Sequence, residues 1–196
     1  MRFQLSYPDE KQLKTYLDQQ KNSKYSYEEV GATRNQQPGG YDNDYNHVVL
    51  GKGDIVWENA KQAIVSWQQY PKPWTNIYPV KAPLKKGQTV AVLFRVAGVW
   101  WRSSARIVYT IDESDRFGWA YGTLNDHVEK GEECFWIEKN EEGFVSYHIR
   151  AFSRPAFWMA RFGYPLARYW QRRFVKESME TMQTISKQAQ NESYAR

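Results

Sequence analysis

Basic and aromatic residues gather near the carboxyl end of this 196-residue chain. The segment 150–176 holds no acidic residue and seven basic ones, which are Arg150, Arg154, Arg161, Arg168, Arg172, Arg173 and Lys176. Eight aromatic residues are interleaved with them, namely Phe152, Phe157, Trp158, Phe162, Tyr164, Tyr169, Trp170 and Phe174. Because the net charge of the whole chain is only +5, the positive charge is local. Such a segment can hold an anionic ligand with an apolar body, face acidic lipid, or form the solvated basic face of an ordinary helix.

Arg150 and Arg154 flank Phe152 where a strand is predicted to give way to a helix. The amino terminus of a helix offers free N–H groups and a positive potential, and two guanidinium groups beside it would add donors for an anion. The sequence therefore predicts an anion site here. Glu132 and Glu133, on the neighbouring predicted strand, are the competing partners, and structural ion pairs are the alternative interpretation.

The segment 116–124 is expected to form a strand with two contrasting faces. One face carries Phe117, Trp119, Tyr121 and Thr123, and the other carries Gly118, Ala120, Gly122 and Leu124. Glycine weakens a strand, so two on one face indicate close approach by a ligand, by backbone or by a bulky neighbour. Rings that face inward would line a cavity. The candidate ligand-binding residues are Trp119, Tyr121, Glu133, Arg150, Phe152, Arg154, Phe162 and Trp170.

Other chemistry finds less support in the residue pattern. His127 could act as an acid or base, but its place in a predicted turn favours a solvated side chain. The three histidines lack the spacing of zinc ligands, and the single cysteine, Cys134, offers no disulfide or thiolate cluster. No phosphate-binding loop or nucleophile elbow is present. We therefore predict no metal and no cofactor.

The amino-terminal half is expected to mix helices with loops. The predicted elements are a helix over 9–20, a polar loop over 33–46, a strand over 46–51, a helix over 54–69 and a proline-rich loop over 70–87. The first 25 residues are interpreted as a helical extension.

From residue 88 to residue 152 the apolar pattern alternates with a period of two, and short turn sequences separate the runs. This is typical of an antiparallel meander. Ser153-Arg154-Pro155 predicts the start of a helix that runs to about residue 188, with a kink at Gly163-Tyr164-Pro165.

The order of elements predicts one α+β domain over 1–196, divided into the extension, a strand-helix-sheet region over 26–154, the long helix over 155–189 and a frayed tail over 190–196. A curved antiparallel sheet of about six strands would grip the long helix. The stripe expected to face the sheet comprises Leu166, Tyr169, Trp170, Phe174, Met182 and Ile185. This plan matches the helix-grip architecture, in which sheet and helix enclose a cavity.

Several stretches resemble the uncharacterised protein family 0548. They are 116–124 (RFGWAYGTL), 131–135 (GEECF), 150–155 (RAFSRP), Gly39-Gly40-Tyr41 and Leu50-Gly51-Lys52-Gly53. The family is similar to the START-like, birch-allergen-like superfamily, whose members bind lipids or other apolar molecules or catalyse reactions in the cavity. The resemblance implies a helix-grip fold and no particular reaction.

Three functions follow as hypotheses. The first is a non-enzymatic carrier or sensor of a hydrophobic small molecule or lipid, which the local positive charge would allow to be anionic. The second is an interaction module that uses a Trp/Arg-rich surface. The third is an enzyme of the same fold, a hydrolase or cyclase, with polar roles for Tyr121, His127, Glu133 or Arg150.

Partners and location follow from charge and hydropathy. Arg161, Arg168, Arg172 and Lys176 could add a weak contact with an anionic membrane surface. Nucleic acid is disfavoured because no binding motif is present. With neither a secretory signal nor the roughly 20 apolar residues of a membrane span, the protein is expected in the cytoplasm.

Overall fold

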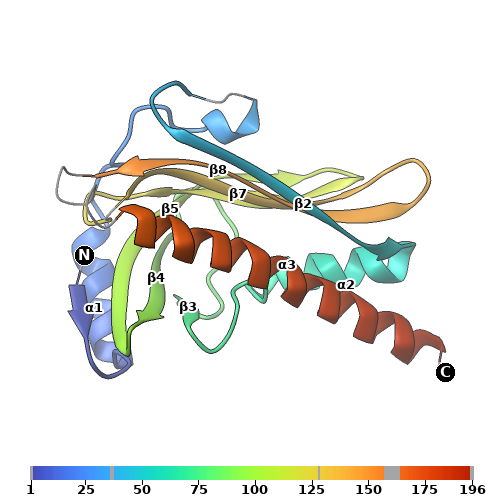
Figure 1. Ribbon diagram of the computed structural model, residues 1–196, viewed down its shortest axis with the longest axis horizontal. Coiled ribbons are helices and arrows are strands. Elements are labelled where there is room, and N and C mark those ends of the chain that lie inside the picture. The colour runs from blue at the N-terminus through green and yellow to red at the C-terminus, as the bar shows by residue number, and fades with distance from the viewer. Residues whose placement is uncertain (1, 36–37, 128, 157–163, 195–196) are drawn as a thin grey trace.

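The computed structural model describes residues 2–35, 38–127, 129–156 and 164–194 (Figure 1). Its elements are, in order, β1 (Arg2–Gln4), α1 (Glu10–Gln20), η1 (Ala32–Arg34), β2 (Asp42–Lys52), α2 (Asp54–Val65), β3 (Thr75–Tyr78), β4 (Thr89–Val96), β5 (Val99–Asp112), β6 (Arg116–Thr123), β7 (Glu129–Lys139), β8 (Phe144–Pro155) and α3 (Tyr164–Tyr194).

The strands form one antiparallel sheet in the order β2-β8-β7-β6-β5-β4-β3, and β1 pairs with β5 beside this path. Neighbours from β4 to β8 are consecutive in the chain, as expected for strands joined by short turns. The predicted α+β fold with a curved antiparallel sheet is therefore confirmed. The sheet has eight strands rather than about six, because the prediction missed the short strands β1 and β3. β1 lies within residues 1–25, so that segment is not only the helical extension that was predicted. β3 also lies inside the segment 70–87, which was wrongly expected to be loop throughout.

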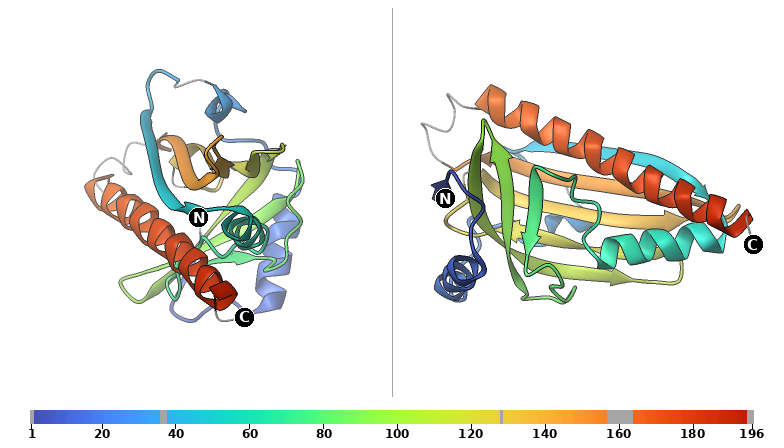
Figure 2. Two further views of the ribbon diagram at one scale, coloured as in Figure 1. Left: turned by 90° about the vertical axis from the view of Figure 1, so that its right-hand side faces the viewer. Right: turned by 90° about the horizontal axis from the view of Figure 1, so that it is seen from below.

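Two helices cover one face of the sheet, and the chain around η1 covers the other (Figures 1 and 2). The main core lies between the sheet and the pair α2 and α3. Alternate residues of the central strands point into it, so that Trp119, Phe135 and Tyr147 are all fully buried. Met182 of α3 is also fully buried against this cluster.

The start of the carboxy-terminal helix differs from the prediction. Ser153 pairs with Gly131 and Pro155 pairs with Glu129, so Ser153-Arg154-Pro155 ends β8 and does not begin a helix. Strand pairing along β7 overrides the local helix-start signal. α3 begins at Tyr164, which places Pro165 in the first turn, where a missing N–H breaks no helical hydrogen bond. The helical segment predicted before the Gly163 kink falls largely on 157–163, outside the described residues.

The stripe of α3 faces the sheet only in part. Phe174 and Ile185 pack against the main core, and Trp170 lies 5.3 Å from Trp74 between ring centroids. Leu166 and Tyr169 are each 58% exposed, contrary to the prediction. Among the described residues, no helix is both long enough and apolar enough to cross a membrane.

Candidate functional site: a cavity between the sheet and α3

A cavity of about 470 Å³ lies between the sheet and the amino-terminal half of α3. Its walls are mainly aromatic and aliphatic, and they include Tyr70, Trp74, Val92, Ile149, Trp170 and Phe174. The sheet supplies one wall because alternate residues of β6, β7 and β8 point toward α3. α3 supplies the opposite wall. The fold thus builds an apolar chamber from segments that lie far apart in the sequence.

Tyr121 and Glu133 form a hydrogen-bonded pair on the cavity side of the sheet. They are opposite each other in the β6–β7 register, and the Tyr121 hydroxyl donates to Oε2 of Glu133 at 2.7 Å. Burial raises the pKa of Glu133 to about 7, helped by the nearby charges of Glu129 and Asp44 and opposed by the Tyr121 hydrogen bond. Burial also raises the pKa of Tyr121 well above its ordinary value. Glu133 can therefore gain or lose a proton near neutral pH while Tyr121 stays protonated.

The Tyr70 hydroxyl lies near this pair and makes no hydrogen bond of normal geometry among the described residues. Tyr70 lines the cavity and is only 3% exposed. Burial and the charge of Glu133 raise its pKa well above the ordinary value, and the neighbouring Tyr121 hydroxyl opposes part of that rise. A buried hydroxyl without a partner costs about 1–3 kcal/mol, so the cavity contains polar capacity that the protein itself does not use.

A second polar contact at the cavity joins Gln171 of α3 to Glu129 of β7. Gln171 donates to Oε2 of Glu129 at 2.6 Å, whereas Oε1 of Glu129 is buried without a partner among the described residues. Burial raises the pKa of Glu129. Arg168 binds both oxygens of Asp44 at 2.5 and 2.8 Å, which ties the start of α3 to β2.

His127 also lines the cavity, in contrast to the solvated turn residue that the sequence predicted. Its Nδ1 accepts a hydrogen bond from the backbone N–H of Glu129 at 3.1 Å. Burial lowers the pKa of His127 to about 4. The imidazole is therefore neutral at physiological pH, and the Nδ1 contact places its proton on Nε2.

The candidate residues that the sequence analysis named lie on both faces of the sheet. Tyr121, Glu133 and Trp170 meet in the cavity. Trp119 is fully buried beneath Trp67, at 4.2 Å between ring centroids, and belongs to the packed core. Phe162 lies outside the described residues.

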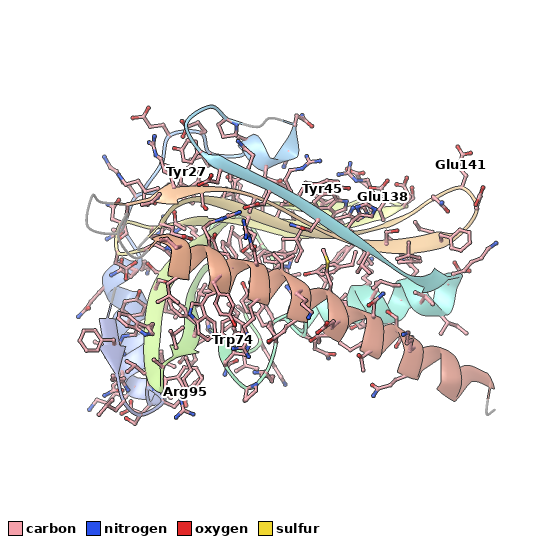
Figure 3. All side chains as sticks on the ribbon, viewed as in Figure 1. Tyr27, Tyr45, Trp74, Arg95, Glu138 and Glu141 are labelled. Carbon is pink, nitrogen blue, oxygen red and sulfur yellow. The ribbon has the colours of Figure 1, made fainter. Side chains whose placement is uncertain are left out.

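Arg150, Phe152 and Arg154 direct their side chains to the face away from α3. Arg150 donates to the carbonyl oxygens of Thr33 and Arg34 at 3.1 Å each. The Arg154 guanidinium lies 4.4 Å from the Tyr41 ring centroid, and the Phe152 ring packs against Tyr27 and Tyr41. Figure 3 places Tyr27 and Tyr45 on this outer side and Trp74 on the side of α3.

The predicted anion site is therefore wrong in its geometry, because no helix begins at Ser153 to supply free N–H groups. The alternative of structural ion pairs also fails. In the parts of the chain that the structure describes, no ion pair joins Glu132 or Glu133 to Arg150 or Arg154.

Glu132 has a structural role on the outer face. It is 2% exposed and accepts hydrogen bonds from the Tyr27 hydroxyl at 2.7 Å, from the Gly31 N–H at 2.7 Å and from both the N–H and the hydroxyl of Thr33. These donors fix the segment around η1 to the sheet.

Gly122 provides the space for this arrangement. A Cβ atom at position 122 would lie 2.0 Å from the Tyr27 hydroxyl oxygen and 2.8 Å from two ring carbons. A bulky neighbour, and not a ligand, explains this glycine. Gly118 is likewise crowded by the backbone of Phe135 and Trp136.

Sequence reasoning missed several cavity residues. Asp44 was assigned to a loop but belongs to β2, and Tyr70 was assigned to a connection without structure. Gln171 carries no motif. The one available signal was the strand parity of Glu129 and Glu133, which are four residues apart and share a face of β7.

Comparison with known proteins shows a match to one family. Residues 26–181 match the model of the domain of unknown function DUF1990. A UPF0548 protein of Dictyostelium discoideum is 32% identical over 197 residues, covering 89% of this chain and 91% of that protein. A UPF0548 protein of Deinococcus radiodurans is 33% identical over 184 residues, covering 87% and 92%.

Solved structures share the fold at low sequence identity. A hypothetical protein of Helicobacter pylori superposes with a TM-score of 0.55 at 14% identity, covering 76% of this chain and 90% of that one. Human STARD10 gives 0.50 at 8% identity, covering 92% and 80%. The di-domain ARO/CYC StfQ from the steffimycin biosynthetic pathway gives 0.50 at 12% identity, covering 80% and 52%.

Proposed function

The chain belongs to the DUF1990 domain family of UPF0548 proteins, and from this premise we propose that it binds a hydrophobic small molecule between its sheet and α3. The observation that carries the proposal is the cavity of about 470 Å³, whose size falls within the roughly 300–1,000 Å³ typical of small-molecule sites. Its largely apolar walls would bury the body of a ligand, and its few polar groups would orient it.

The helix-grip fold supports the same class of ligand. Proteins of the START-like superfamily, which the sequence resembles, hold apolar molecules in the corresponding chamber. The likeness to STARD10 and to StfQ carries the fold alone, since each is far below 25% identical. The proposal therefore depends on the cavity of this chain.

The anionic ligand expected from the sequence loses its main support. Arg150 and Arg154 face away from the cavity and are occupied by backbone carbonyls and by the Tyr41 ring. We therefore propose a hydrophobic ligand and no longer an anionic one.

The test is native mass spectrometry of gently purified protein beside denaturing mass spectrometry and an organic extract of the same sample. The proposal expects an extra mass in one-to-one ratio that disappears on denaturation and reappears in the extract. Protein without any extra mass that also fails to bind neutral apolar probes would overturn it.

An enzyme of the same fold is the second candidate, and the Tyr121–Glu133 pair favours it. A cavity carboxyl whose pKa is raised to about 7 has the property of a general acid or base at neutral pH. StfQ is a di-domain ARO/CYC protein of a biosynthetic pathway, and its fold is compatible with the cyclase alternative. Incubation of the extracted ligand with wild-type and Glu133→Gln protein tests this. A mass change that only the wild type produces would support catalysis, and an unchanged ligand in both would exclude it for that ligand.

The interaction module receives less support. Five of the tryptophans, Trp57, Trp67, Trp74, Trp119 and Trp136, are buried and offer no contact surface. A weak membrane contact would depend mainly on Arg172, because Arg168 is paired with Asp44 and Lys176 with Glu180. Arg161 lies outside the described residues.

A further inference from the structure

We propose that the cavity selects a ligand with a positively charged, amine-like head group, which binds at Glu133 and Glu129 while its apolar body lies against the aromatic walls. This inference rests on the proposed function and names the chemical class of the ligand. The charge proposed for the ligand is opposite to the negative charge that the basic composition of the chain suggested.

The charges that line the cavity are of one sign. Among its described lining residues there is no Arg or Lys, whereas four are acidic: Asp44, Glu129, Glu133 and Glu132, whose carboxylate points to the outer face. Two of the four are satisfied by the protein itself. Arg168 binds Asp44 through two hydrogen bonds, and Glu132 accepts from Tyr27, Gly31 and Thr33. Among the described residues, no ion pair reaches Glu129 or Glu133. Arg168 is near enough to lower the pKa of Glu129, but its hydrogen bonds go to Asp44.

These two carboxyls share the inner face of β7. Glu133 has the Tyr121 hydroxyl as its hydrogen-bond partner, and Oε1 of Glu129 is buried with none in the described part of the chain. Burying a carboxylate is costly unless a charge or donors compensate it. A ligand ammonium would supply both the opposite charge and the missing donors.

Tyr70 provides an independent observation. Its buried hydroxyl lines the same cavity and lacks a partner of normal geometry among the residues that the structure describes. The nearby Tyr121 already donates its proton to Glu133. The Tyr70 oxygen lies beside the Tyr121 hydroxyl and retains a lone pair that can accept an N–H from a head group beside Glu133.

The walls suit a cation as well as an apolar chain. Tyr70, Tyr121, Trp74, Trp170 and Phe174 all line the cavity, and aromatic faces attract an ammonium group within about 6 Å. The aromatic faces and the carboxylates would both repel an anion.

Binding should depend on pH through the carboxyls. The groups that face Glu133 are Tyr121 from β6, Glu129 from its own strand, Asp44 from β2, Tyr147 from β8 and Tyr70 from the connection after α2. From α3, Arg168 pairs with Asp44 and Gln171 binds Glu129.

Glu133 therefore controls the response near neutral pH. The tyrosines stay protonated because burial raises their pKa values, and His127 stays neutral because its pKa is lowered to about 4. The pKa of Glu133, about 7, sets the window. Its carboxylate fraction rises between about pH 6 and pH 8, so the affinity for an alkylamine should rise over that range. The affinity for a fatty acid should fall.

The experiment compares three probes that differ only in the head group: n-decylamine, n-decanol and n-decanoate. Affinities are measured by calorimetry at pH 6 and pH 8 on the full-length protein. The variants are Glu133→Gln and Glu129→Gln, and the matched control is Glu141→Gln, in the exposed turn between β7 and β8. Melting curves verify that each variant is folded.

The proposal expects wild-type protein at pH 8 to bind n-decylamine at least about tenfold more tightly than n-decanol, with a smaller preference at pH 6. Glu133→Gln should remove most of that preference, while Glu141→Gln should retain it. Equal or tighter binding of n-decanol or n-decanoate, with n-decylamine unfavoured, overturns the charge assignment and leaves the proposed function standing. Failure of all three probes contradicts the proposed function as well.

Discussion

The hydroxyl of Tyr121 donates a 2.7 Å hydrogen bond to Glu133 across the β6–β7 pair, inside a chamber whose walls are mostly apolar. This contact offsets only part of the cost of burying the carboxyl, because burial still raises the pKa of Glu133 to about 7. The protein thus retains a titratable group where a packed core would carry an aliphatic side chain. This buried carboxyl is the clearest indication that the chamber has a function beyond stability.

Glu133 should make the fold less stable as the pH rises. Its pKa in the folded state, about 7, lies above the ordinary value of 4.5, so the folded state holds the proton over a pH range in which the unfolded state has lost it. The free energy of unfolding should fall by roughly 3 kcal/mol from this group between about pH 4.5 and pH 8. In the Glu133→Gln variant, the free energy of unfolding should not show this fall with pH. Urea titrations across that range measure it, and identical slopes for the wild type and Glu133→Gln would contradict the assignment.

Arg168 should hold the start of α3 against β2. Replacing it by Met leaves Asp44 without its two charged hydrogen bonds, which should cost about 1–3 kcal/mol and loosen the helix locally. Hydrogen exchange should accelerate in the first turns of α3 more than near Met182. The control is Arg172→Met, an exposed position one turn further on. Equal exchange in both variants would show that the Asp44 pair does not restrain the helix.

Gly122→Ala should disrupt the outer face of the sheet. The added methyl group would overlap the Tyr27 ring and displace the Tyr27 hydroxyl from Glu132, at a cost of about 1–3 kcal/mol. Thermal unfolding measures the loss. Gly39→Ala is the control, because its methyl group would meet no atom within 4 Å. A Gly122→Ala variant as stable as the control would mean that Tyr27 can move aside freely.

Much of the architecture was predictable because strand alternation is a strong signal. The period-two pattern from residue 88 to residue 152 identified the meander from β4 to β8. The order of elements matched the helix-grip plan, and the resemblance to family 0548 implied the same plan. The boundaries were harder. Ser153-Arg154-Pro155 has the local chemistry of a helix start, yet pairing with β7 keeps it in a strand.

The site was predictable only in part. Tyr121, Glu133 and Trp170 emerged from strand parity and aromatic spacing, and they meet in the cavity. Arg150 and Arg154 were predicted to lie at the site but point away from the cavity. Their strand parity was not known from the sequence, and a shift of one residue along a strand places a side chain on the opposite face. Tyr70 carries no local signal, since its role depends on a long connection returning beneath α3 and β7.

The most direct measurement is a titration of neutral n-decanol into wild-type protein and into Ala151→Phe. Ala151 lines the cavity and pairs with Glu133 in the β7–β8 register, so a phenyl ring there would occupy the proposed ligand space. Val49→Phe, at a position 51% exposed, serves as the control. The account predicts saturable one-to-one binding to the wild type and to Val49→Phe, and at least about a tenfold loss for Ala151→Phe. Unchanged binding by a folded Ala151→Phe variant would place the ligand elsewhere and contradict the central claim.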